Sequence, residues 1–306
     1  MLEGPTDGTQ LTLDRMIALQ AEVLSGGGRS LRGLTHFPGL VRGPKRGQGL
    51  DFDDLRLYAP GDDVRHIDWN VTARTGRPHT RLYREERERA VTLALDLRPS
   101  MLTGTRMLRA VAAGELAGAI AWQAAHDGDR TGAAVWSGQA VEASRPASGD
   151  RGALATSRLI AEGFAAVRAR PEGAGGSGLD SFVSWLNGAG RPAGAAILLT
   201  GLDMPGPGFA AAIAEAGKRR RLALIHVLDA MELQSLPPGR YTVTTGGRQV
   251  RTRLDRAAAD AALRRMAETR ARLHAEIEAG GVPVMTHVAG EPAARALAGL
   301  EMRGWL

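Results

Sequence analysis

The stretch Val91-Thr92-Leu93-Ala94-Leu95-Asp96-Leu97 (VTLALDL) is a short apolar run with charged residues shortly before it and Arg98 directly after it. An apolar run of this length is typical of a strand that is buried on both faces of a parallel sheet. Comparable runs occur later in the chain, over residues 131–137, 194–200, 222–228 and 282–288. The sequence therefore predicts a buried sheet that begins with residues 91–97.

Helical patterns separate these apolar runs. They cover residues 106–126, 209–220 and 257–279, which are rich in Ala, and the first of them ends at the break Asp127-Gly128. Strands that alternate with helices in this way form a doubly wound, mostly parallel sheet. The predicted fold class is therefore α/β.

Three segments lie outside the alternation. Residues 11–24 have apolar side chains at near-helical spacing and end at Ser-Gly-Gly-Gly, which predicts an amphipathic helix. Residues 240–254 carry a Gly-Gly pair between two alternating segments, which is typical of a β-hairpin. Residues 51–89 are densely charged, so we expect them to pack on another part of the chain. The expected organisation is an N-terminal helix (1–28), a charged extended arm (29–89) and an α/β domain (90–306) with a hairpin insertion at about 240–254.

The composition excludes several classes of protein. Cys is absent from the 306 residues, which excludes disulfides, thiolate metal ligands and a thiol nucleophile, and suits a reducing compartment. No uncharged apolar run reaches the roughly 18 residues that a membrane helix needs. Residues 1–10 lack a basic region followed by an apolar segment, so no secretory signal is predicted. We therefore expect a cytoplasmic protein without membrane contact.

The charge balance favours an acidic partner only weakly. The chain has 39 Lys+Arg against 33 Asp+Glu, a net charge of +6, and a pI near 10.5. A basic chain suits nucleic acid or acidic proteins. However, the basic residues alternate with acidic ones, and Lys occurs only at Lys45 and Lys218, a bias that GC-rich codons also produce. Nucleic acid is therefore not the expected main partner.

Conventional catalytic motifs are missing from the sequence. It contains no P-loop, nucleophile elbow, HExxH motif or Cys/His cluster. Gly173, Gly175 and Gly178 match GxGxxG, but they follow Arg-Pro-Glu instead of a strand, so they do not indicate a dinucleotide site. The seven His residues occur singly. We expect no catalytic residue.

Residues 56–75 (RLYAPGDDVRHIDWNVTART) concentrate turn-forming and oppositely charged side chains. The Pro-Gly pair presets a tight turn, and three Arg lie within reach of three Asp. Two interpretations are open. The cluster is either a structural clasp that pins the arm on the α/β domain under Trp69 as an apolar lid, or a docking surface for another protein. We call it the charged clasp, and its residues are Arg56, Pro60, Gly61, Asp62, Asp63, Arg65, Asp68, Trp69 and Arg74.

The charged clasp, with GQGLDF before it and VTLALDL after it, closely resembles the bacterial family called domain of unknown function 58. The resemblance extends to residues 127–130, to residues 223–243 and to the closing GVPVMTHVAGEPAARAL. It implies a von Willebrand factor A-like domain that works with a MoxR-type AAA+ ATPase in maturing or remodelling other proteins. The chain resembles the short type of member without membrane helices.

The resemblance also implies a place where a metal ion would lie. In von Willebrand A domains the first strand ends in Asp-x-Ser-x-Ser, and Thr and Asp from two further loops complete a Mg²⁺ site at the carboxyl edge of the sheet. Here Arg98 replaces the first Ser. A guanidinium at roughly 4 Å would repel Mg²⁺ by about 8 kcal/mol at an effective dielectric of about 20. We therefore expect no cofactor. The residues that match the metal site are Asp96, Ser100 and a displaced Asp203, with Ser177 or Asp180 in place of the missing Thr.

The leading functional hypothesis is a non-catalytic adaptor that binds protein. Its docking surface would be the charged clasp or the carboxyl edge of the sheet, where Arg98 would pair with a carboxylate of the partner. A hydrolase that uses Asp62, Asp63 and Asp68 is disfavoured, because three close Arg would keep these acids ionised. The alternative function is nucleic-acid binding by the basic N-terminal arm, which contains Arg29, Arg32, Arg42, Lys45 and Arg46.

Overall fold

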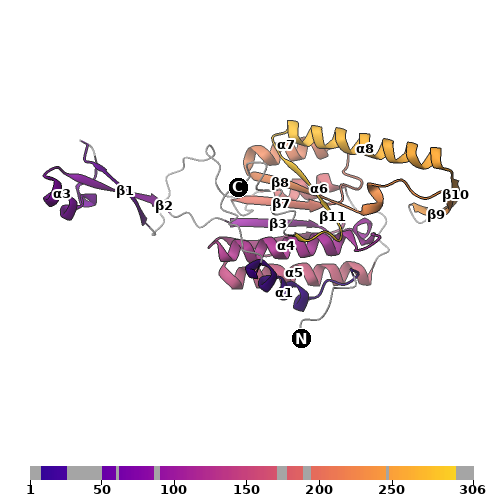
Figure 1. The fold of residues 1–306 in the computed structure, drawn as a ribbon, viewed down its shortest axis with the longest axis horizontal. Helices are drawn as coiled ribbons and strands as arrows, with labels where there is room; N and C mark the ends of the chain where they lie inside the picture. The colour runs from indigo at the N-terminus through magenta and orange to yellow at the C-terminus, as the bar shows by residue number, and fades with distance from the viewer. Residues whose placement is uncertain are drawn as a thin grey trace. The chain divides into compact units, whose positions relative to one another are not determined.

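The computed structural model describes residues 8–25, 50–59, 62–85, 90–170, 178–188, 194–245 and 248–293. The chain divides into two compact units, one formed by residues 38–88 and the other by residues 1–37 and 89–306. The larger unit contains the α/β sheet (Figure 1).

Among the described residues, seven strands form the central sheet in the order β11-β8-β7-β3-β4-β5, and β6 also pairs with β4. Strands β11, β8, β7, β3 and β4 are parallel, whereas β5 and β6 are antiparallel to β4. The predicted doubly wound, mostly parallel sheet is thus confirmed. The strands are β3 (Ala90–Asp96), β4 (Arg130–Trp136), β5 (Val141–Ala143), β6 (Ala147–Ser148), β7 (Ala195–Thr200), β8 (Arg221–Leu228) and β11 (Val284–Val288).

Helices cover both faces of this sheet (Figure 1). Successive side chains of β3 point to opposite faces, so Leu93 and Leu95 join one hydrophobic core while Ala94 joins the other. The first core contains side chains of α1 (Leu13–Ser25), α4 (Arg109–His126) and α5 (Gly149–Ala169). The second contains side chains of α6 (Leu179–Leu186), α7 (Phe209–Arg219) and α8 (Arg256–Ala279).

Helix α1, which corresponds to the helix predicted over residues 11–24, packs closely on α4. A Cβ atom at Gly118 would lie 2.8 Å from the Cε of Met16, so the small residue permits the close approach. The indole N–H of Trp122 donates to the Met16 carbonyl at 2.8 Å. The N-terminal helix is therefore part of the α/β unit. Although α4 is mostly apolar, no described helix is long and apolar enough to cross a membrane.

A hairpin leaves the carboxyl end of β8 and precedes α8. Its strands, β9 (Gly239–Thr245) and β10 (Arg248–Leu254), pair antiparallel, which confirms the predicted hairpin. Two short 3₁₀ helices also lie beyond the carboxyl ends of strands. They are η2 (Pro99–Leu102) after β3 and η3 (Ala230–Glu232) after β8.

The smaller unit differs from the predicted extended arm. Its strands β1 (Leu50–Leu57) and β2 (His79–Glu85) pair antiparallel, and between them lie η1 (Val64–His66) and α3 (Trp69–Thr75). The backbone N–H of Asp68 donates to the His79 carbonyl at 2.8 Å, and that of Tyr58 donates to the Pro78 carbonyl at 2.9 Å. Local backbone pairing therefore gives this charged segment a fold of its own, which its thin apolar content did not predict.

Candidate functional site

The carboxyl ends of β3 and β7 meet where the winding of the sheet changes direction. In the chain β3 is followed by β4 on one side, and the later strand β7 lies on its other side. Open α/β sheets bind their ligands at such switch points. Asp96 ends β3 and Thr200 ends β7, and both are completely buried. The Thr200 hydroxyl donates to Asp96 Oδ2 at 2.8 Å, which links the two strand ends.

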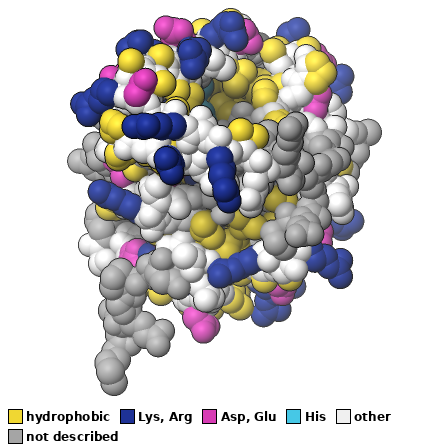
Figure 2. Space-filling model, turned by 90° about the vertical axis from the view of Figure 1, so that its right-hand side faces the viewer, with side chains coloured by type: hydrophobic (Ala, Val, Ile, Leu, Met, Phe, Trp, Pro, Cys, Tyr) yellow, Lys and Arg dark blue, Asp and Glu magenta, His cyan; other side chains and the backbone are white. Residues whose placement is uncertain are grey.

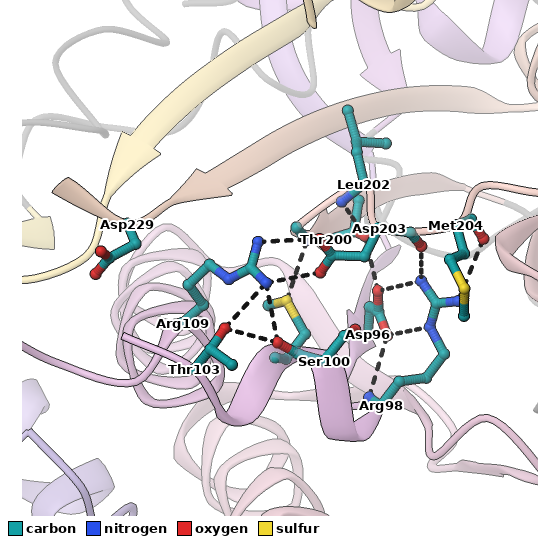
Figure 3. A network of polar contacts seen from close by, with 12 residues as sticks. Asp96, Arg98, Ser100, Thr103, Arg109, Thr200, Leu202, Asp203, Met204 and Asp229 are labelled. Carbon is teal, nitrogen blue, oxygen red and sulfur yellow. Dashed lines mark hydrogen bonds and ion pairs between the residues drawn. The ribbon is translucent and has the colours of Figure 1, made fainter. Parts of the chain in front are cut away.

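Arg98 forms a buried ion pair with Asp96 (Figure 3). Its Nε donates to Oδ1 and its Nη2 to Oδ2, each at 2.9 Å, and its backbone N–H donates to Oδ1 at 3.1 Å. The Nη2 also donates to the Asp203 carbonyl at 2.6 Å. Since only 6% of the Arg98 side chain is exposed, this guanidinium is part of the interior.

A second buried arginine lies beside the first. Arg109, at the start of α4, donates from Nη2 to the Asp203 carboxylate at 2.7 Å and to the Ser100 carbonyl at 2.9 Å. Its Nη1 reaches Glu232 at 3.4 Å. Arg109 thereby joins the loop after β7 to the loop after β8.

The two carboxyl groups around Arg109 have perturbed acidities. Burial raises the pKa of Asp203 above its ordinary value, although the charge and hydrogen bond of Arg109 act to lower it. Burial also raises the pKa of Glu232, against the hydrogen bond from the Asp229 backbone and the charge of Arg109. Carboxyl groups with shifted pKa values concentrate at functional sites. This edge of the sheet is therefore the candidate site.

Asp229 fixes the loop after β8. Its carboxylate accepts hydrogen bonds from the Thr105 backbone at 2.7 Å, from the Thr105 hydroxyl at 3.0 Å and from the Met231 backbone at 2.9 Å. Burial alone would raise the pKa of Asp229, but these hydrogen bonds prevail and lower it. The Glu232 carboxylate accepts the Asp229 backbone N–H at 2.8 Å, which completes a capping box on η3.

A buried histidine supports the start of the loop after β7. His226 lies with its Nε2 3.0 Å from the Gly201 carbonyl and its Nδ1 2.8 Å from His274 Nε2. Burial, together with the neighbouring His274, lowers the pKa of His226 to about 3. The imidazole is therefore neutral, with Nε2 donating to Gly201 and Nδ1 accepting from His274.

The loop after β7 contains two strained residues. Leu202 and Met204 have φ angles of 54° and 42°, a left-handed conformation that is unfavourable for residues other than Gly. The Arg98 guanidinium donates to the carbonyl groups of Asp203 and Met204 at 2.6 and 3.4 Å. Strain of this kind persists where surrounding contacts enforce it, often at functional sites.

Large apolar side chains are exposed on both loops. Met204 is 72% exposed on the loop after β7, and Met231 and Leu233 are 49% and 43% exposed on the loop after β8. Figure 2 shows the side of the molecule toward which β7 and β8 point. Hydrophobic side chains lie there among Lys and Arg side chains. We call Met204, Met231 and Leu233 the methionine edge.

The matching residues do not fit a Mg²⁺ site as they stand. Both oxygens of Asp96 are bonded to Arg98, and the Asp203 carboxylate is bonded to Arg109. The Ser100 hydroxyl is buried without a partner at hydrogen-bonding geometry, although it is near enough to Asp203 to help lower the pKa of that carboxyl. The positive charge at this edge of the sheet is thus supplied by the side chains of Arg98 and Arg109.

Neither substitute for the missing Thr lies in this network. Ser177 is outside the described residues. Asp180 accepts hydrogen bonds from the backbones of Ser181 and Gly208 at 2.9 and 3.3 Å, so it holds the segment before α7. Within the described part of the chain, no three His, Asp or Glu side chains are grouped to hold a metal ion.

Two arginines of the charged clasp pair with neighbouring Asp residues where the structure describes this segment. Arg56 Nη2 donates to Asp62 Oδ1 at 2.6 Å, and Arg65 Nη2 donates to Asp63 Oδ2 at 2.8 Å. The other oxygen of Asp62 accepts the Ala59 backbone N–H at 2.9 Å. The predicted turn residues Pro60 and Gly61 lie outside the described residues.

The structure places three further clasp residues at α3. Asp68 caps α3 by accepting the backbone N–H groups of Asn70 and Val71 at 3.0 and 3.1 Å. Arg74 is exposed in the last turn of α3. Trp69 is 67% exposed, so within the smaller unit it does not cover the ion pairs as a lid. A large exposed indole is instead a feature that suits docking.

The acidities of the clasp argue against acid catalysis. The hydrogen bond from the Ala59 backbone, together with Arg56, lowers the pKa of Asp62. The hydrogen bond from Arg65 lowers the pKa of Asp63 to about 2. A general acid needs a raised pKa, so the hypothesis of a hydrolase that uses these Asp residues loses support.

Sequence reasoning missed the second arginine and its partners. The sequence contained one indication of a special role for Arg109: its charge lies directly before the mostly apolar residues 110–125. Its partners Asp203 and Glu232 lie 94 and 123 positions away, so the pairing could not be read from spacing. The basic arm residues Arg29, Arg32, Arg42, Lys45 and Arg46 lie outside the described residues.

The fold and the network define a class: an open, doubly wound α/β domain with a charge network at its switch point. Residues 54–277 match the model of the family described as "Protein of unknown function DUF58". This match covers more than half of the chain, so the chain belongs to that family, as the sequence predicted.

Curated relatives in mycobacteria share part of this chain. The uncharacterized proteins Rv1480 of Mycobacterium tuberculosis and Mb1516 of Mycobacterium bovis are 41% identical to it over 107 residues. The match covers 34% of this chain and 32% of each relative. The aligned part is thus about a third of the length of these relatives.

Solved structures with a similar arrangement are more distant. The conserved hypothetical protein BatB from Bacteroides thetaiotaomicron is 16% identical, with a TM-score of 0.41 over 71% of this chain and 98% of its own. A von Willebrand factor type A protein from Catenulispora acidiphila is 15% identical, with a TM-score of 0.33 over 49% of this chain and 34% of its own.

Proposed function

We propose that this chain is a non-catalytic, cytoplasmic adaptor that binds another protein through the methionine edge. The observation that carries the proposal is the exposure of Met204, Met231 and Leu233 on two loops that the ion pairs of Arg98 and Arg109 hold in place. Met is a versatile contact residue because its unbranched, polarisable side chain adapts to different partners. Braced loops lose little conformational entropy on binding, which favours affinity.

The proposed partner is a MoxR-type AAA+ ATPase, with which this chain would mature or remodel other proteins. The resemblance of the charged clasp and the following strand to the family supports this part of the proposal. The exposed Trp69 gives the smaller unit a second surface of the kind that interfaces use. In this proposal each unit contributes its own contact to the complex.

Co-purification of the full chain with the MoxR-type ATPase of the same organism tests the proposal. The measurement is repeated with ATP, with ADP and without nucleotide. We expect binding in at least one state, and a loss of about tenfold or more in affinity for the variant Met204→Ser/Met231→Ser, because central apolar contacts carry most of the binding free energy.

Met266 provides the matched control. It is 47% exposed on α8, so Met266→Ser removes the same chemistry from a helix and should leave the affinity unchanged. Absence of binding in every nucleotide state would refute the ATPase as partner. Equal losses for the Met266 variant and the edge variant would refute the methionine edge as its docking surface.

A second candidate function is nucleic-acid binding, because one face of the β9–β10 hairpin is strongly basic. Residues on that face alternate, so Arg251 and Arg253 share it, and Arg253 lies opposite Arg240 in the register. All three are exposed. Like charges placed directly opposite destabilise a hairpin, and a polyphosphate backbone would relieve that repulsion.

Salt-dependent binding of mixed-sequence DNA and RNA tests this candidate. The variant Arg240→Gln/Arg251→Gln/Arg253→Gln should reduce the salt slope by up to about 3, because each phosphate contact contributes roughly one. The control variant Arg151→Gln/Arg158→Gln/Arg170→Gln removes as many exposed charges from α5 and its end. No binding at low ionic strength, or equal effects of the two variants, would dismiss the hairpin as a nucleic-acid surface.

A further inference from the structure

The carboxylate of Asp96 is fully occupied by groups of its own chain. Oδ1 accepts from the Arg98 backbone N–H at 3.1 Å and from Arg98 Nε at 2.9 Å. Oδ2 accepts from Arg98 Nη2 at 2.9 Å and from the Thr200 hydroxyl at 2.8 Å. A carboxylate has about four lone-pair sites, so these hydrogen bonds use its whole capacity.

The other groups around this pair are oxygen atoms of the kind that bind hard cations. The Thr200 hydroxyl contacts Asp96, the buried Ser100 hydroxyl lies near the Asp203 carboxylate, and the Asp203 carbonyl accepts from Arg98. Mg²⁺ prefers carboxylate, hydroxyl and carbonyl oxygens in a close cage. Asp96 and Thr200 supply oxygens of this kind at one point, and the guanidinium of Arg98 binds the same carboxylate.

Arg98 also performs the positioning that a cation would perform there. Its guanidinium connects the end of β3 to the carbonyl groups of Asp203 and Met204. The same loop contains Leu202 and Met204 in the left-handed conformation, which has to be held by contacts. Because Arg98 is covalently part of the chain, this support is present at any concentration of metal ion.

The geometry points to Arg98 as a built-in replacement for the divalent cation at this edge of the sheet. The loop after β7 is therefore assembled without metal, and removal of the guanidinium uncovers a latent Mg²⁺ site formed by Asp96, Ser100 and Thr200. This inference does not depend on which partner binds. We expected Arg98 to pair with a carboxylate of the partner. Asp96 already occupies the guanidinium, so such a carboxylate would have to compete with Asp96.

Thermal unfolding of the full chain in EDTA and in Mg²⁺ or Mn²⁺ tests the inference. The Tm of the wild-type chain should be the same in all three conditions. The variant Arg98→Ser should have a lower Tm in EDTA. At about a hundredfold excess of cation over its dissociation constant, that Tm should rise by roughly 4 to 5 °C.

Arg98→Met is the control, because it fills similar space but offers no ligand oxygen and no charge. Its Tm should fall without recovering in Mg²⁺ or Mn²⁺. The double variant Arg98→Ser/Asp96→Ser should lose the response of the single variant to cations. Equal responses of the Ser and Met variants would overturn the latent site.

A direct measurement keeps the inference testable if Arg98→Ser does not fold. Titration calorimetry of the wild-type chain with Mn²⁺ should give no heat of binding at this edge. A wild-type Tm that rises with Mg²⁺, or one-to-one Mn²⁺ binding that Asp96→Asn abolishes, would overturn the replacement by Arg98.

Discussion

Arg109 Nη2 lies 2.7 Å from the carboxylate of Asp203, and this ion pair joins the first turn of α4 to the strained loop after β7. Through its Nη1 the same guanidinium reaches Glu232 in η3. Arg109 and Arg98 thus bind the loop after β7 from two sides, Arg109 at the Asp203 carboxylate and Arg98 at the neighbouring carbonyl groups. The loops of the methionine edge are positioned by these two buried arginines.

Arg109→Met should destabilise the chain by about 2 kcal/mol, because it leaves two half-buried carboxylates without their counter-charge. The loss should grow as pH rises and Asp203 and Glu232 ionise. Chemical denaturation of the wild type and the variant at several pH values measures it. Arg219→Met is the control, since Arg219 forms an exposed pair with Glu215 and should cost less than about 1 kcal/mol. Equal losses for the two variants would contradict the bracing role of Arg109.

The buried His226 should make the folded chain less stable in mild acid. Its pKa is about 3 in the folded chain and about 6.5 when unfolded. Between these values the unfolded state binds a proton that the folded state does not, so stability falls as pH falls below about 6.5. From pH 7 to pH 5 the contribution of this residue is a loss of about 2 kcal/mol.

The variant His226→Gln isolates this contribution, since Gln can still donate to the Gly201 carbonyl but does not titrate. The difference in unfolding free energy between pH 7 and pH 5 should be smaller in the variant by about 2 kcal/mol. A His226 variant with the pH profile of the wild type would show that this histidine is not buried in its neutral form.

The sequence predicted the central sheet well, and local physics explains why. Strands β3, β7 and β8 are buried on both faces, so each is a continuous apolar run that is visible without knowledge of its neighbours. The hairpin β1–β2 was missed. Its segment carries charges at Asp51, Asp53, Asp54 and Arg56, which obscure any alternation, and its pairing partner is separated from it by α3.

The candidate site was predictable only in part. The competition between Arg98 and a cation was implied by the family resemblance, because Arg98 stands where the von Willebrand A pattern has the first Ser after the Asp that ends the strand. By contrast, the contact of Asp229 with Thr105 spans 124 positions, and the fold alone brings these residues together. The left-handed conformations of Leu202 and Met204 contradict the backbone preference of residues other than Gly, so no residue pattern predicted them.

The same substitution at Trp69 and at Trp122 should change the stability by very different amounts. Trp69 is 67% exposed, whereas Trp122 is 5% exposed. Trp69→Ala should therefore change the unfolding free energy by less than about 0.5 kcal/mol, and Trp122→Ala should cost about 3 to 5 kcal/mol. If Trp69 is part of an interface, its loss should also weaken partner binding by about thirtyfold, as for a central Trp contact. A Trp69 variant with unchanged stability and unchanged partner affinity would remove the charged clasp from the proposed interface.

Substitutions at Met204 and Leu202 distinguish the effect of backbone strain on stability from the effect of a side chain on docking. Both have positive φ angles, so Gly at either position relieves a cost of about 1 kcal/mol. Met204 is 72% exposed and Leu202 is 7% exposed. Met204→Gly should therefore leave the chain equally stable or more stable by up to about 1 kcal/mol, while it removes a docking side chain. Leu202→Gly should destabilise the chain by about 2 kcal/mol, because the loss of a buried Leu exceeds the relief of strain. Denaturant unfolding compares the two, and a destabilised Met204→Gly variant would mean that the Met204 side chain supports the fold itself.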